Sequence, residues 1–136
     1  MQSLHKLFER FTQLNYSPIT GGIAFEALAN ALDKEETILK VIEGSITTSV
    51  GLIIATDLRI FYIGLTRFNK TVLQQISYDS IISVEMAEPK IISVELNIIT
   101  KTGGNILVRG CDYTESKKFV ELLRMLTLHN SISQAS

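Results

Sequence analysis

The stretch from Val50 to Leu65 is apolar at both odd and even positions, apart from a break at residues 56–58. Its β-branched and aromatic side chains favour extended strands. The polar residues Thr56 and Asp57 predict a tight turn between two antiparallel strands. Because both faces of each strand are apolar, we expect this pair to be covered on both sides, in the interior of a sandwich or barrel.

Further strand patterns precede and follow this pair. Residues 81–88 and 91–100 alternate between apolar and polar side chains, which is typical of strands with one buried face. The side chains expected to face inward are Ile82, Val84 and Met86 in the first run and Ile92, Val94, Leu96 and Ile98 in the second. The whole pattern predicts seven strands, at residues 37–43, 50–55, 59–65, 71–77, 81–88, 91–100 and 105–109. A loop of small residues is expected at 44–49.

Three stretches have the spacing of amphipathic helices. They cover residues 3–14, 23–32 and 113–128. The apolar faces consist of Leu4, Leu7, Phe8, Phe11 and Leu14 in the first, Phe25, Leu28 and Leu32 in the second, and Phe119, Leu122, Leu123 and Leu126 in the third. Asp112 and Glu115 stand at the spacing of a capping box, which predicts the start of the third helix.

The helix at residues 3–14 has two interpretations. In one, it docks on a membrane or on a partner protein; in the other, it covers the sheet of its own domain. The side chains that would make the docking contact are Leu4, Leu7, Phe8 and Phe11. A helix that lies on a membrane surface usually carries more Lys and Arg on its polar face than this one does. We therefore favour a helix that packs on its own domain.

Composition and charge narrow the class of protein. The 136 residues suffice for one domain, or for one domain with an appendage, and 46% hydrophobic content is ample for a core. The change from helical to strand spacing divides the chain into a helical preface at 1–32, a main domain at 33–128 and a flexible tail at 129–136. A formal net charge of −1 argues against nucleic acid as a partner. One cysteine, no signal-peptide pattern and no membrane-spanning run together predict a cytoplasmic protein.

No group of residues has the spacing of a catalytic, metal or cofactor site. His5 and His129 lie near opposite ends of the chain, and neither has a carboxylate or nucleophile at motif spacing. Cys111 stands just before the last helix, where a thiol of low pKa is physically possible. A packing cysteine is the commoner case, and we favour it. We therefore expect no cofactor, no metal and no enzymatic activity.

One group of cations deserves a functional hypothesis. Arg59, Arg67 and Lys70 stand around the predicted turn between the third and fourth strands, and Phe68 is at its tip. In one interpretation, this exposed aromatic side chain and its neighbouring cations contact an anionic surface or a partner. In the other, which we favour, the segment is a solubilising turn with Phe68 partly tucked against the domain.

The order of seven antiparallel strands and one amphipathic helix resembles the pleckstrin-homology (PH) fold. The residues that carry the resemblance are Asp33, Glu35 and Glu36 before the first strand, Gly51, TDLRIFYI at 56–63 and ISYDSIISV at 76–84. They are similar to the bacterial PH-like family of the YokE-like type, over about residues 30–128. The resemblance implies a mainly β (α+β) fold, a seven-stranded antiparallel barrel or sandwich of two bent sheets. The C-terminal helix caps one open corner, and this chain adds two N-terminal helices.

The resemblance also implies a binding function. PH domains that bind phosphoinositides place several Lys and Arg around the loop between the first two strands, whereas residues 44–50 contain none. We therefore argue against phosphoinositide binding, which needs several convergent cationic donors. We expect a non-enzymatic scaffold for protein–protein association, above all self-association. The reasons are the excess of apolar residues on both faces of the second and third strands and two preface helices that a barrel does not require. The unpaired edges of an imperfect barrel are also natural templates for association. The alternative is a peripheral membrane or lipid-binding module with weak association at the membrane surface.

Overall fold

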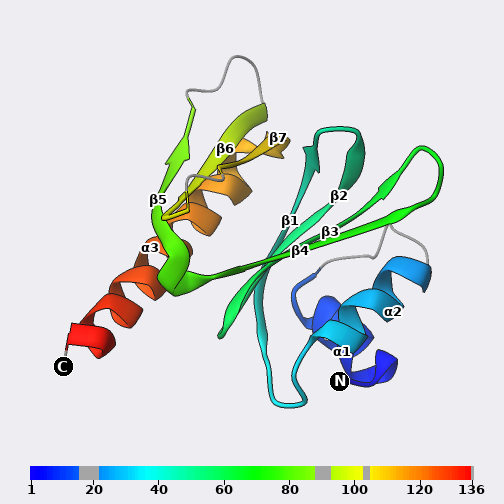
Figure 1. Ribbon diagram of the computed structural model, residues 1–136. Coiled ribbons are helices and arrows are strands. Elements are labelled where there is room, and N and C mark those ends of the chain that lie inside the picture. Colours follow the sequence, from blue (N-terminus) through cyan, green and yellow to red (C-terminus); the bar gives the residue numbers. More distant parts are fainter. Residues whose placement is uncertain (16–21, 88–92, 103–104, 136) are drawn as a thin grey trace.

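The computed structural model describes residues 1–15, 22–87, 93–102 and 105–135 (Figure 1). The helices in these ranges are α1 (Leu4–Gln13), α2 (Gly22–Ala31) and α3 (Tyr113–Ala135), and a short 3₁₀ helix, η1, spans Tyr78–Ser80. The strands are β1 (Ile38–Ile46), β2 (Ser49–Thr56), β3 (Arg59–Thr66), β4 (Thr71–Ser77), β5 (Ile81–Met86), β6 (Ser93–Thr100) and β7 (Ile106–Asp112).

The seven strands form one antiparallel sheet in the order β4-β3-β2-β1-β7-β6-β5. Within the described residues, β1 and β7 are in register only at Ser45 and Arg109. The sheet bends at this narrow join and curls into a half-barrel, and α3 packs against β1, β5, β6 and β7 (Figure 1). The predicted fold of seven antiparallel strands, a closing helix and two N-terminal helices is confirmed.

Two apolar layers cover the opposite faces of β2 and β3. The inner layer lies between the concave face of the sheet and α3 and includes Ile53, Ile60, Tyr62, Phe119 and Leu123. The outer layer lies beneath α1 and α2 and includes Leu7, Phe11, Phe25, Leu52, Phe61 and Ile63. The prediction that this strand pair is covered on both sides is confirmed. The second cover is supplied by the N-terminal helices.

The connection between β1 and β2 is shorter than predicted. The register pairs next to it are Gly44 with Gly51, Ser45 with Val50, and Ile46 with Ser49. The expected loop at 44–49 is therefore wrong, and only two residues remain for the turn, with Thr47 at a φ of 49°. Small residues in sequence favour a loop, yet they pair well where the facing strand is in register.

One side chain of β5 faces the opposite way from the prediction. Ile82 is expected inside but is 63% exposed. The register shifts between Ile81 and Ser83, so a β-bulge turns Ile82 outward and buries Ile81 instead. The residues buried as predicted are Val84, Val94, Leu96 and Ile98, and Met86 is partly buried. The predicted inward residue Ile92 lies outside the described residues.

The closing helix begins where predicted and ends later. Asp112 Oδ2 accepts the backbone N–H of Glu115 at 2.9 Å, which satisfies one free donor of the first turn. The helix continues to Ala135 instead of ending at Leu128, since residues 129–135 contain no glycine or proline to stop it. Within the described part of the chain, no helix combines the length and the apolar character needed to cross a membrane.

The strands β2 and β3 approach closely at the paired glycines Gly51 and Gly64. A Cβ at Gly51 would overlap the carbonyl oxygen of Ile63, a backbone atom that no side-chain rotation can move away. We expect Gly51→Ala to lower the free energy of unfolding by about 2–3 kcal/mol, as overpacking does, in urea denaturation. An equal loss for Val50→Ala, whose side chain is 67% exposed, would contradict this explanation.

Candidate functional site

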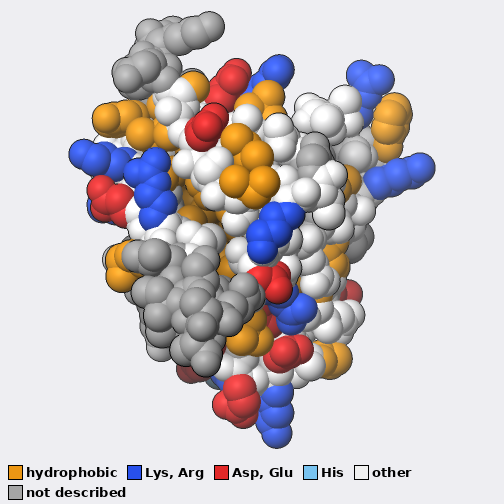
Figure 2. All heavy atoms as spheres, turned by 60° about the vertical axis from the view of Figure 1, so that its left-hand side comes forward, with side chains coloured by type: hydrophobic (Ala, Val, Ile, Leu, Met, Phe, Trp, Pro, Cys, Tyr) orange, Lys and Arg blue, Asp and Glu red, His pale blue; other side chains and the backbone are white. Residues whose placement is uncertain are grey.

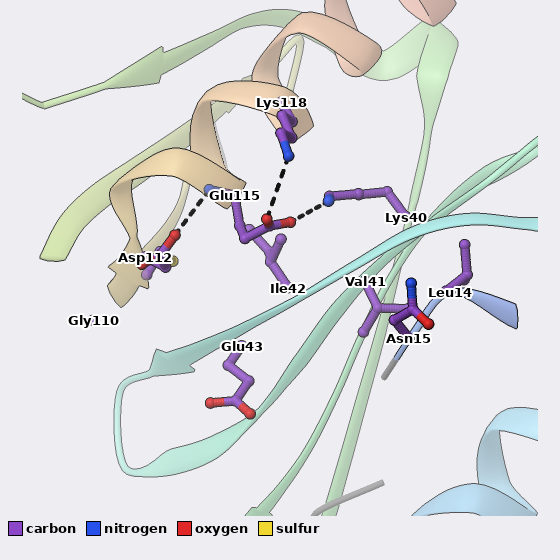
Figure 3. Close-up of a pocket in the computed structure, with 11 residues that line it drawn as sticks. Leu14, Asn15, Lys40, Val41, Ile42, Glu43, Gly110, Asp112, Glu115 and Lys118 are labelled. Carbon is purple, nitrogen blue, oxygen red and sulfur yellow. Dashed lines mark hydrogen bonds and ion pairs between the residues drawn. The ribbon is translucent and has the colours of Figure 1, made fainter. Parts of the chain in front are cut away.

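A groove of about 670 Å³ opens where β1 and β7 separate beyond their join (Figure 3). Its walls are β1, the junction of β7 with α3, and the end of α1. The lining residues that carry charge are Lys40, Glu43, Asp112, Glu115 and Lys118. At the join itself, Gly44 lets β7 approach β1, because a Cβ there would overlap the side chain of Val108.

Glu115 is the centre of the charges in this groove. Its carboxylate forms an ion pair with Lys40 of β1, and its Oε1 lies 3.7 Å from Nζ of Lys118 on the next turn of α3. The hydrogen bond from Lys40 is the largest of the effects that hold the pKa of Glu115 below its ordinary value. The ion pair with Lys40 joins β1 to α3 across the groove, as the dashed lines in Figure 3 show.

Cys111 lies in the wall of the groove, and its side chain is fully buried. Burial raises the pKa of this thiol to about 11. The thiol is therefore neutral at physiological pH and is not an activated nucleophile. No cluster of metal-ligating side chains exists among the described residues. The groove offers apolar walls and paired charges, which are contacts for binding.

The structure separates Arg59 from the other members of its predicted group. Those members are Arg67, Phe68 and Lys70. Arg59 is the first residue of β3 and the others follow its last, and a strand of eight residues spans roughly 25 Å. Arg59 instead donates Nε–H to Oε2 of Glu36 at 3.1 Å and Nη2–H to Oε1 at 2.7 Å. The grouping of Arg59 with the turn is therefore wrong, and its guanidinium has an internal partner.

Glu36 is the centre of a network that joins the helices to the sheet. Thr56 Oγ1 donates to its Oε2 at 2.6 Å, and the backbone N–H of Asp33 donates to its Oε1 at 3.0 Å. Burial raises the pKa of Glu36, but these hydrogen bonds and those from Arg59 outweigh burial and hold the pKa below its ordinary 4.5. Arg59 also donates to the carbonyl oxygen of Ala31 at 3.1 Å, so the network fixes the end of α2 to β3.

The turn between β3 and β4 exposes the remaining cations and the aromatic side chain. Phe68 is not tucked against the domain, because it is 71% exposed and the guanidinium of Arg67 lies 5.0 Å from its ring centroid. Thr66 Oγ1 accepts the N–H groups of Phe68 and Lys70, which fixes the turn. The turn between β1 and β2 lies at the same end of the sheet and presents the exposed Val50.

The helix α1 packs on its own sheet and uses half of its predicted docking face to do so. Leu7 and Phe11 are fully buried in the outer layer. Leu4 and Phe8 are 38% and 41% exposed, and the ring of Phe8 lies 5.2 Å from that of Phe25. Only Leu4 and Phe8 are therefore left for a contact with another molecule.

Two features of the structure are not predicted from the sequence: the ion pair that crosses the groove and the free edge of β4. Lys40 and Glu115 are 75 residues apart and belong to no motif, so their pairing leaves no local signal. The free edge of β4 does leave a signal, because residues 71–77 contain no charged residue and no proline.

On the face drawn in Figure 2, cationic and anionic side chains are interspersed, so that face has no broad basic surface.

Comparison with known families tests the resemblance of this chain to PH-like proteins. Residues 32–125, which hold the sheet and most of α3, match the model of the bacterial PH domain family. The chain belongs to the bacterial PH domain family. The expected PH-like fold is thereby confirmed, and α1 and α2 both precede the matched region of this PH domain. A comparison with curated proteins finds no significant match.

Solved structures share the same fold at low identity. A pleckstrin homology domain from Shewanella amazonensis is 20% identical, with a TM-score of 0.53 over 76% of this chain and 97% of that one. The C-terminal domain of an unknown protein from Leishmania infantum is 14% identical, with a TM-score of 0.53 over 76% of this chain and 92% of that one. The hSac2 domain of the human phosphoinositide phosphatase Sac2 is 12% identical, with a TM-score of 0.58 over 95% of this chain and 85% of that one.

The likeness to the hSac2 domain reaches beyond the sheet. Because it covers 95% of this chain, it includes most of the helical preface at residues 1–32. As a member of the bacterial PH domain family, this chain is a binding or scaffold module in general terms.

Proposed function

We propose that this PH domain is a non-enzymatic scaffold for protein–protein association, above all association with a second copy of itself. Membership of the bacterial PH domain family supports a binding or scaffold role in general. The state of Cys111 agrees with a non-enzymatic role, because its thiol is buried and its raised pKa keeps it protonated.

The open sheet is the observation that carries this proposal. The half-barrel ends at β4 on one side and β5 on the other, and these two strands have no pairing with each other in the sheet order. The chain covers the faces of its own sheet with α3 inside and with α1 and α2 outside. In the sheet as the structure describes it, the two edges, β4 and β5, are left without a neighbouring strand. Their unpaired N–H and C=O groups are natural partners for a strand of another chain.

Light scattering on the eluate of a sizing column tests self-association. We expect the mass to rise with concentration from the 15.2 kDa of one chain toward twice that value. Added salt should leave this association largely intact, because backbone hydrogen bonds are not screened as surface charges are. A mass that stays at 15.2 kDa across the concentration series would contradict the proposal.

A second candidate function is peripheral membrane binding through the turn between β3 and β4. The observation that favours it is the exposure of Phe68, which is 71%, between the cations Arg67 and Lys70. An apolar ring with adjacent cations suits the boundary between acyl chains and anionic headgroups. Val50, 67% exposed at the neighbouring turn, adds apolar surface at the same end of the sheet.

Flotation with vesicles that contain anionic lipid tests this second candidate. If the turn contacts lipid, flotation decreases with added salt, and the double variant Arg67→Glu with Lys70→Glu no longer floats. The matched control is Lys101→Glu with Lys117→Glu, which makes the same charge change at exposed positions away from the turn. Unchanged flotation of the turn variant would exclude this turn as the lipid contact.

A further inference from the structure

The strand β4 is an edge strand without the usual protection against pairing. Natural edge strands are protected by charged side chains, prolines, bulges or short length. β4 has seven residues, none of them charged or proline, and its register with β3 is continuous. The other edge, β5, carries Glu85 and the bulge at Ile82. Among the described residues, β4 is therefore the edge that is open to another strand.

Alternate residues of β4 point their backbone groups away from the sheet. The N–H of Thr66 donates to the carbonyl oxygen of Lys70 at 3.0 Å, and bonded and non-bonded pairs alternate from there along β3 and β4. The residues whose N–H and C=O groups point away from β3 are therefore Thr71, Leu73, Gln75 and Ser77. The helix α2 packs near β4 but leaves residues 73–75 exposed, so it does not cover the edge.

We infer that β4 pairs with β4 of a second copy, antiparallel, about a two-fold axis at Gln74. This inference rests on the proposed self-association and names its surface. In this register, Leu73 faces Gln75 of the second copy. Thr71 likewise faces Ser77, so the outward-pointing N–H groups of both strands are all paired. The carbonyl oxygen of Ser77 already accepts the hydroxyl of Ser80 at 2.8 Å and can accept a second bond. An axis at Leu73 or Gln75 would leave one end of each strand without a partner.

The residues that flank β4 make this edge complementary to itself. Lys70 precedes the strand and Asp79 follows it, and both are exposed. In this register Lys70 of each copy lies opposite Tyr78 of the other, one residue from Asp79 of η1, and the strand between them carries no charge to repel. Opposite charges across a strand pair stabilise that register. Because the opposite charges at the two ends of β4 belong to the same chain, the partner that fits this edge is a second copy of the chain.

Substitution of the side chain at the axis can change the pairing of the two strands without changing the core of either copy. Gln74 of one copy faces Gln74 of the other in a non-hydrogen-bonded pair, where Cα atoms are about 4.5 Å apart. Two amides at this distance hydrogen-bond, whereas two like charges repel. Gln74 is exposed in the single chain, so a charge at this position does not disturb the core.

Charge complementation at residue 74 tests the inference. Gln74→Lys and Gln74→Glu should each weaken self-association roughly fivefold or more, and an equimolar mixture of the two should restore it through mixed pairs. Ile82→Lys, at an exposed position on β5, is the matched control and should associate like the wild type. Light scattering gives the mass of each sample, and thermal melts show that each variant is folded.

The outcomes distinguish this inference from the proposed function. Weakened association of both single variants, with recovery in the mixture, supports pairing through β4. Wild-type association of both variants overturns the β4 interface but leaves self-association through another surface standing. A wild-type chain that stays monomeric overturns the proposed function and this inference together.

Cysteine cross-linking measures the register independently. Gln74→Cys places two thiols across a pair whose Cα separation suits a disulfide, which needs roughly 4.4–6.8 Å. The native Cys111 is buried and does not compete. In Leu73→Cys, the matching thiol of the second copy is displaced along the strand by two residues, more than about 7 Å away. We expect a disulfide-linked dimer from Gln74→Cys alone, and equal cross-linking of both variants would overturn the register.

Discussion

A chain that ends at Gly110 should show no cooperative melt. It lacks α3, which buries Phe119, Val120 and Leu123 against the concave face of the sheet. Burial of these side chains contributes about 1.5–3 kcal/mol each. Their sum is comparable to the whole net stability of a small domain, roughly 5–15 kcal/mol. Without the helix, the inner faces of β5, β6 and β7 would be open to water.

Thermal unfolding followed by circular dichroism measures this effect, and a chain that ends at Leu128 is the control. The control keeps Leu126, which packs against the inner layer, and loses only the end of α3. It should therefore melt cooperatively. A cooperative melt of the chain that ends at Gly110 would contradict the claim that α3 completes the core of the half-barrel.

Arg59→Met should lower the free energy of unfolding by about 3 kcal/mol, as is typical when one partner of a buried ion pair is removed. The change leaves Glu36, whose side chain is fully buried, without an opposite charge. It also removes the guanidinium that lies 4.8 Å from the ring centroid of Phe61. Methionine retains much of the packing of the arginine stem, so the loss reports mainly on the charge.

Urea denaturation measures this loss, and Arg67→Met is the matched control. Arg67 is exposed at the turn between β3 and β4, so its substitution should change the free energy of unfolding by less than about 0.5 kcal/mol. Equal effects of the two substitutions would mean that the pair of Glu36 and Arg59 does not fix the helices to the sheet.

The cost of Arg59→Met should depend on pH in a defined direction. The pKa of Glu36 in the folded protein is lowered from 4.5, so its contribution to stability is present above pH 4.5. That contribution is lost as the pH falls through the lowered pKa of the folded state. We therefore expect the difference between wild type and variant to shrink from about pH 7 to about pH 3. A difference that stays constant over this range would contradict the role of Glu36 as a buried charge.

Much of this fold can be predicted from local spacing. Strands and helices depend on side chains a few residues apart, and the apolar residues on both faces of β2 predict its two covers. The predicted strand bounds and side-chain directions are wrong where pairing with a neighbouring strand determines them. The bulge at Ile82 depends on the register with β6, and the extension of β1 to Ile46 depends on the register with β2.

The candidate sites were harder to predict because they depend on contacts between distant residues. Closeness in sequence groups Arg59 with Arg67, yet the extended strand β3 places them at opposite ends of the sheet. Glu36 lies 23 residues before Arg59, so no local spacing links the two residues. The uncharged run at residues 71–77 is visible in the sequence, but its meaning depends on the strand order, which places β4 at an edge.

Hydrogen exchange of the β4 amides at several protein concentrations tests the central claim most directly. If the open edge of this PH domain pairs two copies, the outward-pointing N–H groups of Leu73 and Gln75 gain protection as concentration rises. The N–H groups of β5 at the other edge should exchange at rates that do not depend on concentration. Concentration-independent exchange at Leu73 and Gln75 would contradict the account.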